Sequence, residues 1–388
     1  MGTIQIEYLK NICTHSKGKK PKQLSTSESK LYSIPYINIK SFERGIYDEY
    51  TDGVNCNLCE DGDLLMVWDG ARAGLTGRAK KGAIGSTLMK IEPTKRLHKE
   101  YLFYFLKSIY RKLNTNPRGV GIPHVEPTLL WDSELALPPI PQQQLIVCKL
   151  EELFSKLDKG VESLKTLQRQ LKVYRQAVLN STFIIDDKAN CSIKDVVGKI
   201  QIGPFGSQLH KEDYIENGIP LINPTHIKNG AIIADYSFSI LQEKRDSLPN
   251  YILEEGDIIM GRRGEMGRCG LVTSKEVGWF CGTGSLYFRP EPSKINSVYL
   301  YHFLLSEPVK KYLETNAGGT TMANLNKKIV SEIPIALPSL QEQNKIVEGI
   351  ESRLSVCNKI EETITNALKE AEALRQSILK QAFEGKLV

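Results

Sequence analysis

The sequence predicts an α/β (α+β) protein with two similar globular domains, separated by two long helices that form an antiparallel coiled coil with pseudo-twofold symmetry. The first observation behind this prediction is that a long helix-forming segment occurs twice, 200 residues apart. The second is that residues 1–136 and 186–336, which precede the two copies, both read as short strands punctuated by turns. Solenoid and propeller repeats have periods of roughly 20 to 50 residues. So long a period therefore indicates duplication of a whole domain-plus-helix unit.

The first long helix is expected within residues 137–185, directly after a proline-rich start. Proline is tolerated in the first turn of a helix but disrupts its interior, and residues 142–183 contain none. Apolar residues recur every seven positions, at Leu150, Leu157, Leu164, Leu171 and Val178. A companion series three residues further on comprises Leu153, Leu167 and Tyr174. This heptad pattern predicts a coiled coil.

The second long helix, within residues 337–388, aligns with the first without a gap. Its matching seam is Ile350, Cys357, Ile364, Ala371 and Ile378, with the companion series Ile360, Ala367 and Leu374. Small residues in this seam allow a partner helix to approach closely, and the bulkier first helix is the simplest partner. An isolated heptad run would more commonly be ordinary core packing. Because the run is repeated in the same register, we expect an intramolecular antiparallel pair instead.

The bulk properties place the chain among folded proteins without identifying its partners. Of 388 residues, 41% are hydrophobic and 25% charged, as in ordinary globular proteins. No apolar run reaches the roughly 18 to 20 residues that cross a bilayer, and residues 1–10 lack a signal-peptide core. We therefore expect a cytoplasmic protein without membrane contact, in which the eight cysteines are reduced. The net charge of +6 permits nucleic-acid binding but does not require it.

The two predicted domains share short motifs that are mostly apolar or turn-forming. The matching pairs of segments are 34–38 and 219–223, 62–66 and 256–260, and 101–106 and 299–304. A fold needs such residues for its interior, whereas the polar loops between them differ. This pattern is expected if the two domains share an architecture but contact different ligands.

Together these features resemble the DNA-specificity subunit of type I restriction–modification systems. The resemblance is carried by Leu-Pro-Pro-Ile-Pro-Gln-Gln-Gln at 137–144 with its echo at 337–343, by the helix ends at 175–179 and 375–379, and by Gly-Pro-Phe-Gly-Ser at 203–207. It implies target-recognition domains at 1–136 and 186–336, a central conserved helical region at 137–185 and a C-terminal one at 337–388. The corresponding stretch of the first domain, residues 13–22, lacks Gly-Pro-Phe-Gly-Ser. We therefore expect the two domains to read different base sequences.

The resemblance also implies the function and the partners. It implies a non-catalytic subunit whose two domains each read one half of a bipartite, asymmetric site in double-stranded DNA. The paired helices would set the spacing of the half-sites and dock methyltransferase subunits, two of which are expected, with restriction subunits joining through the complex. No cofactor is expected in this chain, because S-adenosylmethionine, ATP and Mg²⁺ would belong to the partner subunits.

Candidate DNA contacts are polar loop residues, because phosphates require Lys, Arg or backbone N–H groups and base edges require side chains such as Arg, Asn, Gln, Ser or Thr. In the first domain they are Lys17, Lys19, Lys20, Lys22, Arg72, Arg78, Arg118 and His124. In the second domain they are Gln201, Ser207, Gln208, Arg262, Arg263, Arg268, Thr320, Thr321 and Asn324. We expect the glycine-flanked arginines of the two domains to correspond, and likewise the late loops around positions 118–124 and 320–324. The alternatives are a merely solvated basic loop and surface ion pairs. Phe205 is expected to be a packed loop anchor rather than a base-stacking group.

The sequence gives little support for a methyltransferase active site, a nucleotide-binding site or a metal site. Asn-Pro-Thr-His at 223–226 lacks the second proline and the aromatic residue of the amino-methyltransferase motif, and no phosphate-binding Gly-x-x-x-x-Gly-Lys-Ser/Thr loop occurs. Cys13, His15, Cys56 and Cys59 could in principle hold zinc, but buried thiols are commoner, so no metal is predicted. One alternative function remains, a coiled-coil scaffold that bridges protein partners without DNA specificity. A free-standing nuclease would need an acidic–lysine cluster that we do not find.

Overall fold

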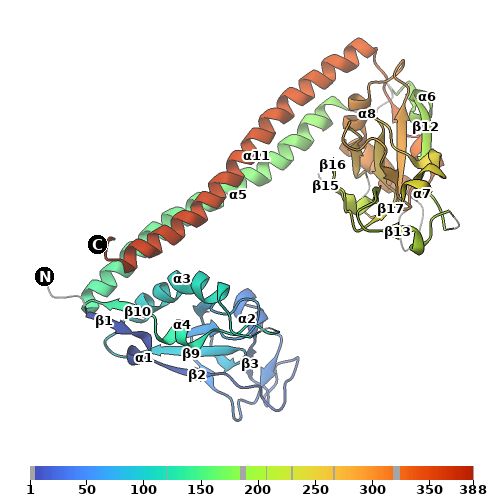
Figure 1. Cartoon of the computed structure of the whole chain (residues 1–388). Helices are drawn as coiled ribbons and strands as arrows, with labels where there is room; N and C mark the ends of the chain where they lie inside the picture. The colour runs from blue at the N-terminus through green and yellow to red at the C-terminus, as the bar shows by residue number, and fades with distance from the viewer. Residues whose placement is uncertain are drawn as a thin grey trace. The chain divides into compact units, whose positions relative to one another are not determined.

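The computed structural model describes residues 5–119, 121–183, 189–206, 208–228, 230–264, 267–317 and 324–387. The chain divides into two compact units, unit 1 with residues 1–165 and 365–388, and unit 2 with residues 166–364. The two longest helices, α5 (Ile140–Thr182) and α11 (Leu340–Phe383), each run through both units (Figure 1). Each of the two units therefore contains one globular domain and a part of each long helix. Within the described residues, no helix is both long and apolar enough to cross a membrane.

The globular domain of unit 1 is built on two four-stranded sheets, with strand orders β2-β9-β6-β7 and β4-β3-β8-β5, beside the pair β1-β10. Its strands are β1 (Gln5–Tyr8), β2 (Cys13–Lys17), β3 (Ile34–Ile37), β4 (Tyr50–Thr51), β5 (Leu58–Cys59), β6 (Leu64–Val67), β7 (Thr76–Arg78), β8 (Gly82–Ile84), β9 (Leu88–Pro93) and β10 (Glu134–Leu137). Its helices are α1 (Leu9–Ile12), α2 (Ile39–Arg44), α3 (Lys99–Thr115) and α4 (Pro127–Trp131).

The globular domain of unit 2 repeats this plan, with sheets β12-β21-β18-β19 and β13-β17-β14-β20 and the pairs β11-β22 and β15-β16. Its strands are β11 (Cys191–Ser192), β12 (Val197–Ile202), β13 (Tyr214–Ile215), β14 (Ile219–Ile222), β15 (Ile227–Lys228), β16 (Ala231–Ile232), β17 (Ser239–Ile240), β18 (Ile258–Gly261), β19 (Cys269–Leu271), β20 (Phe280–Cys281), β21 (Ser285–Pro290) and β22 (Pro334–Ile335). Its helices are α6 (Ile193–Val196), α7 (Gln242–Asp246), α8 (Ser297–Leu304), α9 (Glu307–Asn316) and α10 (Lys327–Ser331), with 3-10 turns at Lys211–Asp213, Pro224–His226 and Pro249–Tyr251.

The strand register shows that the two domains share one architecture, as predicted. In unit 1, β6 and β9 are antiparallel with Leu64 opposite Ile91, and in unit 2, β18 and β21 are antiparallel with Ile258 opposite Phe288. In both domains one parallel pair, β3 with β8 and β14 with β20, lies in the second sheet. The apolar motifs shared in the sequence supply these strands and the helices that cover them, so they form the buried cores.

A buried glutamine joins each domain to the start of a long helix. The amide oxygen of Gln143 accepts the backbone N–H of His98 at 2.7 Å, and its amide nitrogen donates to the carbonyls of Arg96 and Pro138 at 3.0 and 2.7 Å. Gln343 makes the same contacts with Asn296 at 2.8 Å and with Lys294 and Pro338 at 3.1 and 2.9 Å. Both glutamines are fully buried. The repeated Pro-x-x-x-x-Gln spacing thus satisfies the backbone groups where the helix leaves the domain.

The long helices pair antiparallel, as the sequence predicted. In unit 1, Asp158 near the middle of α5 forms an ion pair with Arg375 near the end of α11. In unit 2, Arg175 near the end of α5 donates to Asn358 at 2.7 Å and to Glu361 at 2.8 Å, both earlier in α11. The repeated arginine of the two helix ends therefore ties the helices together in each unit.

Of the two predicted seams, the main one is better buried between these helices than its companion. Cys357 and Ile364 are 1% and 3% exposed, in line with their predicted place in the contact. The companion seam is wrong in part, because Leu167, Tyr174, Ile360 and Leu374 are 42–51% exposed, whereas Leu153 and Ala367 are half-buried. A pair of helices without further neighbours covers only a narrow stripe on each, so the companion positions face outward.

Candidate functional site

Three loops of the first domain meet around Asp69, at the end of β6. Its carboxylate lies 2.9 Å from the Lys17 ammonium and 2.6 Å from Nδ1 of His124. The backbone of His124 forms bridges with both Asp69 and Arg118. The structure thus brings Lys17, Arg118 and His124 together, as a candidate site requires. No sequence motif surrounds Asp69, and its place just after a buried strand is the only signal that could have identified it.

The lysines that follow β2 project from a turn that only glycine can form. A Cβ atom on Gly18 would lie 2.1 Å from the carbonyl oxygen of Gly85. After this close approach, Lys19, Lys20 and Lys22 are exposed, and within the described part of the chain none of them forms a salt bridge. Three uncompensated cations therefore lie close together in the chain, next to the Asp69 cluster.

Arg72 and Arg78 differ from this cluster because both are engaged in ion pairs. Arg72 lies 2.9 Å from Glu43, with 62% of its side chain exposed. Arg78 pairs with Glu100 and lies 4.1 Å from the ring centroid of Phe103, and the Glu100 carboxylate raises the pKa of its guanidinium. Both contacts match the ion-pair alternative that the sequence left open.

The predicted correspondence of Arg78 with an arginine of the second domain is wrong. Arg78 lies opposite Leu64 at the start of β6, whereas the same place opposite Ile258 in β18 holds Leu271. Arg78 therefore lies beside the start of β6, whereas Asp69 follows the end of this strand. Sequence spacing alone misaligned the two loops because nine residues separate Met66 from its partner Thr76, whereas eight separate Met260 from its partner Cys269.

In the second domain, Arg263 and Asn324 take the places of Asp69 and His124. The two pairs form the same antiparallel bridge between the loop after the central strand and the late loop. In support, Val125 donates to the carbonyl of Trp68 at 2.9 Å, and Leu325 donates to that of Arg262 at 3.0 Å. This confirms the predicted correspondence of the late loops at His124 and Asn324. Thr320, Thr321 and Ser207 lie outside the described residues.

The neighbouring arginines 262 and 263 have different surroundings. Arg262 is buried, 5% exposed, and its Nε donates to the carbonyl of Leu325 at 2.9 Å. Burial lowers the pKa of its guanidinium, with a further contribution from Arg263. Arg263 is exposed, and among the described residues it has no salt bridge. Arg263 is therefore the residue of this pair that can meet a ligand from solution.

Phe205 is not the packed anchor that the sequence led us to expect. Its side chain is 59% exposed, although its backbone is held in a tight turn by a bond from Gln208 N–H at 2.8 Å. Gln208 also accepts the Tyr251 hydroxyl at 2.7 Å, and Gln201 donates to the carbonyl of Ile202 at 2.8 Å. The expectation was wrong because the chain turns at Phe205, and the Arg262 side chain occupies the space beneath the Phe205 ring.

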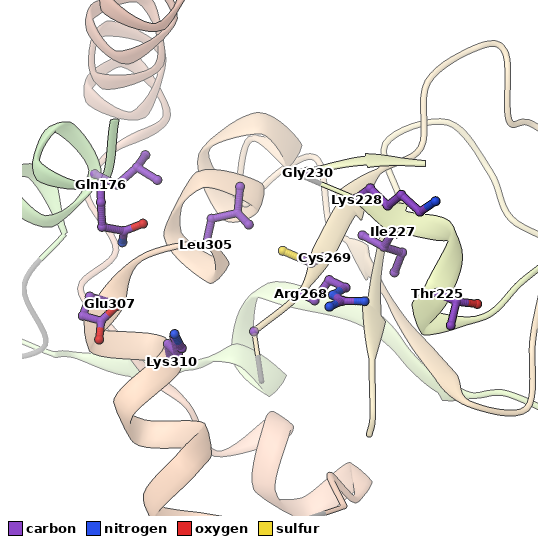
Figure 2. Close-up of a pocket in the computed structure, with 12 residues that line it drawn as sticks. Gln176, Thr225, Ile227, Lys228, Gly230, Arg268, Cys269, Leu305, Glu307 and Lys310 are labelled. Carbon is purple, nitrogen blue, oxygen red and sulfur yellow. The ribbon is translucent and has the colours of Figure 1, made fainter. Parts of the chain in front are cut away.

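Arg268 lies apart from these residues, in a cavity of about 770 Å³ within unit 2 (Figure 2). Its guanidinium donates to the carbonyl of Pro224 at 3.1 Å. Among the described residues of the lining, Lys228 from β15 and Lys310 from α9 add two further cations, against the single carboxylate of Glu307. The sequence did not single out either lysine, because no local motif surrounds them and only the fold brings them to Arg268.

The cysteines of the first domain do not gather at a metal site. Among the described residues, no group of three or more His, Cys, Asp or Glu is placed to hold a metal ion. Burial raises the pKa of the Cys13 thiol to about 12 and that of Cys59 to about 11, and His15 stacks on Trp131 with ring centroids 4.4 Å apart. All eight cysteines are free.

Comparison with known proteins adds independent information. A family model described as "Type I restriction modification DNA specificity domain" matches residues 2–172 and 186–370. The chain is 26% identical over 377 residues to the type I restriction enzyme MjaVIII specificity subunit of Methanocaldococcus jannaschii, covering 91% of this chain and 87% of that protein. It is 24% identical over 385 residues to the EcoBI specificity subunit of Escherichia coli, covering 91% and 80%.

Two solved structures have similar folds. A chain from a study of the assembly and conformational transition of the type I R-M system aligns with a TM-score of 0.73 and 18% identity, covering 98% of both chains. The HsdS subunit from Thermoanaerobacter tengcongensis aligns with a TM-score of 0.53 and 18% identity, covering 98% of this chain and 97% of that one. At this identity the likeness concerns the fold.

Proposed function

The chain belongs to the type I restriction–modification DNA specificity family, and from that premise we propose that its two domains each read one half of a bipartite, asymmetric DNA site. The observation that carries this proposal is that equivalent loop positions hold different side chains. Asp69 and His124 in the first domain correspond to Arg263 and Asn324 in the second. Hydrogen-bond donors and acceptors of such side chains read the base edges. Two domains with the same fold but different loop side chains are therefore suited to two different half-sites.

The basic residues around these loops would hold the DNA backbone. Phosphate contacts fix register and orientation on the duplex, and they require cations without carboxylate partners. Lys19, Lys20 and Lys22 meet this requirement in the first domain. In the second, Lys228 and Lys310 in the lining of the cationic cavity offer a similar surface. Arg72 and Arg78 are weaker candidates, since each would have to exchange an ion pair for a phosphate.

The proposed partners are two methyltransferase subunits docked on the long helices, with restriction subunits joining through them. The chain itself would be non-catalytic, while S-adenosylmethionine, ATP and Mg²⁺ would be bound by the partners. Support comes from the outward-facing apolar residues of the helices in unit 2, which include Val173, Tyr174, Val356 and Ile360 at 42–70% exposure. Exposed apolar side chains that gather on one stretch of paired helices favour a protein interface. The free cysteines agree with a cytoplasmic setting.

Arg263→Ala should weaken recognition of the second half-site by about 5- to 150-fold, because a good base contact contributes about 1–3 kcal/mol of discrimination. Recognition of the first half-site should be unchanged. His124→Ala should have the reciprocal effect. The measurement is binding of the full chain to duplexes with either half-site scrambled, at several salt concentrations, after methylome sequencing of the source cell has given the target.

The control for these variants is Lys275→Ala, an exposed charge beyond the other end of β19, which should bind like the wild type. Affinity of the wild type should fall steeply with salt if phosphates contribute. A wild-type chain that is indifferent to both base sequence and salt would favour the alternative function, a scaffold that bridges protein partners. Loss of both half-sites in either variant would mean that the contact has been misplaced.

Lengthening the helices should shift the preferred gap between half-sites. We propose inserting four residues into α5 and four into α11 at the level of the Asp158–Arg375 ion pair, so that the antiparallel register is kept. Four residues lengthen a helix by about 6 Å, which is close to the rise of two base pairs at about 3.4 Å each. Selection of bound duplexes from a library with varied gaps would measure the shift. An unchanged preferred gap would contradict the proposal that the helices set the spacing.

A further inference from the structure

The ring of Phe205 is presented to solvent on a turn that the fold holds in place. Gly203 precedes it with its N–H bonded to the carbonyl of Ser285 at 2.9 Å, and a Cβ atom there would lie 1.9 Å from the carbonyl oxygen of Gly282. Pro204 fixes the next backbone angle, and the bond from Gln208 N–H to the carbonyl of Phe205 closes the turn at 2.8 Å. An apolar ring 59% exposed is therefore held in a defined position rather than on a loose loop.

The inner face of this ring is supported by a buried cation. The guanidinium carbon of Arg262 lies 5.4 Å from the ring centroid of Phe205. Among the described residues, no carboxylate forms a salt bridge with Arg262, whose Nε is bonded to the carbonyl of Leu325. A buried cation without an anion is costly unless other contacts compensate, and attraction to an aromatic face is one such contact. The result is a stacked pair whose outer surface is an open aromatic face.

Candidate base-reading residues lie close to Phe205 and Arg262 in the chain, or form a backbone bridge with such a residue. Arg263 directly follows Arg262 and forms the backbone bridge with Asn324, while Gln208 closes the turn that carries Phe205. We propose, building on the proposed DNA function, that Phe205 stacks on an unstacked base or a deoxyribose of the second half-site. An aromatic ring beside donors and acceptors supplies apolar contact that hydrogen-bonding side chains cannot.

The equivalent positions of the first domain lack this arrangement. Gly18 corresponds to Gly203, since its N–H bonds to Leu88 where Gly203 bonds to Ser285, so Lys20 stands at the place of Phe205. Trp68 stands at the place of Arg262 and is half-buried. The first domain thus presents a charged side chain where the second presents a ring. The stacking contact is therefore specific to the second half-site.

The test compares Phe205→Ala, Phe205→Leu and Phe205→Trp in the full chain on the target duplex. Stacking on a base contributes about 1–3 kcal/mol, so Phe205→Ala should weaken binding by about 5- to 150-fold. The slope of affinity against salt should not change, since no charge is removed. Phe205→Trp should retain binding, and Phe205→Leu should lose most of it. Tyr8→Ala removes an exposed aromatic ring from β1 of the first domain and should bind DNA normally.

A spectroscopic arm tests stacking directly. 2-Aminopurine is placed in turn at each position of the second half-site, and the wild type should change its fluorescence at a position where Phe205→Ala does not. The proposal is overturned if Phe205→Ala binds the intact target within twofold of wild type, or loses affinity equally when the second half-site is scrambled. It is also overturned if Phe205→Ala impairs only assembly with the methyltransferase partner. A wild type without sequence preference would instead refute the proposed function itself.

Discussion

Arg289→Met is expected to lower the free energy of unfolding by about 3–5 kcal/mol, because it leaves a buried carboxylate without its counter-ion. Asp257 is 1% exposed and accepts two bonds from the Arg289 guanidinium, at 2.9 Å from Nε and 2.8 Å from Nη2. The same guanidinium donates to the carbonyl of Ile252 at 3.1 Å. This pair joins β18 to β21 in the sheet that carries the loop of Arg262 and Arg263, so its loss should also disturb recognition of the second half-site.

Urea unfolding of the full chain, followed by circular dichroism, measures the effect. The control is Arg245→Met, which breaks an ion pair with the adjacent and half-exposed Asp246 and should cost less than about 1 kcal/mol. Adding Asp257→Asn to Arg289→Met should recover part of the loss, because it removes the unpaired charge. Equal stability of Arg289→Met and Arg245→Met would show that the buried pair does not hold the sheet together.

Gln343→Ala is expected to cost about 3 kcal/mol, since removal of one partner leaves buried donors and acceptors unsatisfied. The substitution would remove the hydrogen-bond partner of the Asn296 N–H and of the Lys294 and Pro338 carbonyls, all of which bond to the Gln343 amide. Because Asn296 also caps α8 through its side chain, the junction between domain and helix should loosen. Gln143→Ala should have the same effect in unit 1, where the contacts are identical in kind.

The repeated motif supplies matched controls for these variants. Gln341 and Gln142 are exposed neighbours of the buried glutamines, and Gln341→Ala and Gln142→Ala should change stability by less than about 0.5 kcal/mol. Hydrogen exchange should locate the weakened region in the first turns of α8 or α3. Similar stability of the buried and exposed variants would mean that the motif is kept for some other contact.

The features that the sequence predicts correctly are the periodic and the repeated ones. The heptads at Leu150 to Val178 and Ile350 to Ile378 predicted two long helices and their antiparallel pairing. The duplicated apolar motifs predicted two domains of one architecture, and the comparisons confirm the family. Predictions of this kind succeed because helix and strand periodicities are local properties of the chain.

Predictions about individual side chains depended on contacts that the sequence does not reveal. Arg262 and Arg263 look alike as neighbours in a loop, yet the first is buried under Phe205 and the second is exposed. The partner of Arg262 is the carbonyl of Leu325, 63 residues away. The register of β7 and β19, which separates Arg78 from its supposed counterparts, is likewise set by pairing between strands.

The sequence by itself determined that the chain is a duplicated unit of one domain and one helix, and to which family it belongs. Only the tertiary structure decided which cations are free, that Phe205 faces solvent, and that most of the companion seam of the helices is exposed. The physical reason is that apolar periodicity records which face of an element is buried. The exposure and charge compensation of a loop side chain depend instead on groups that folding brings from distant parts of the chain.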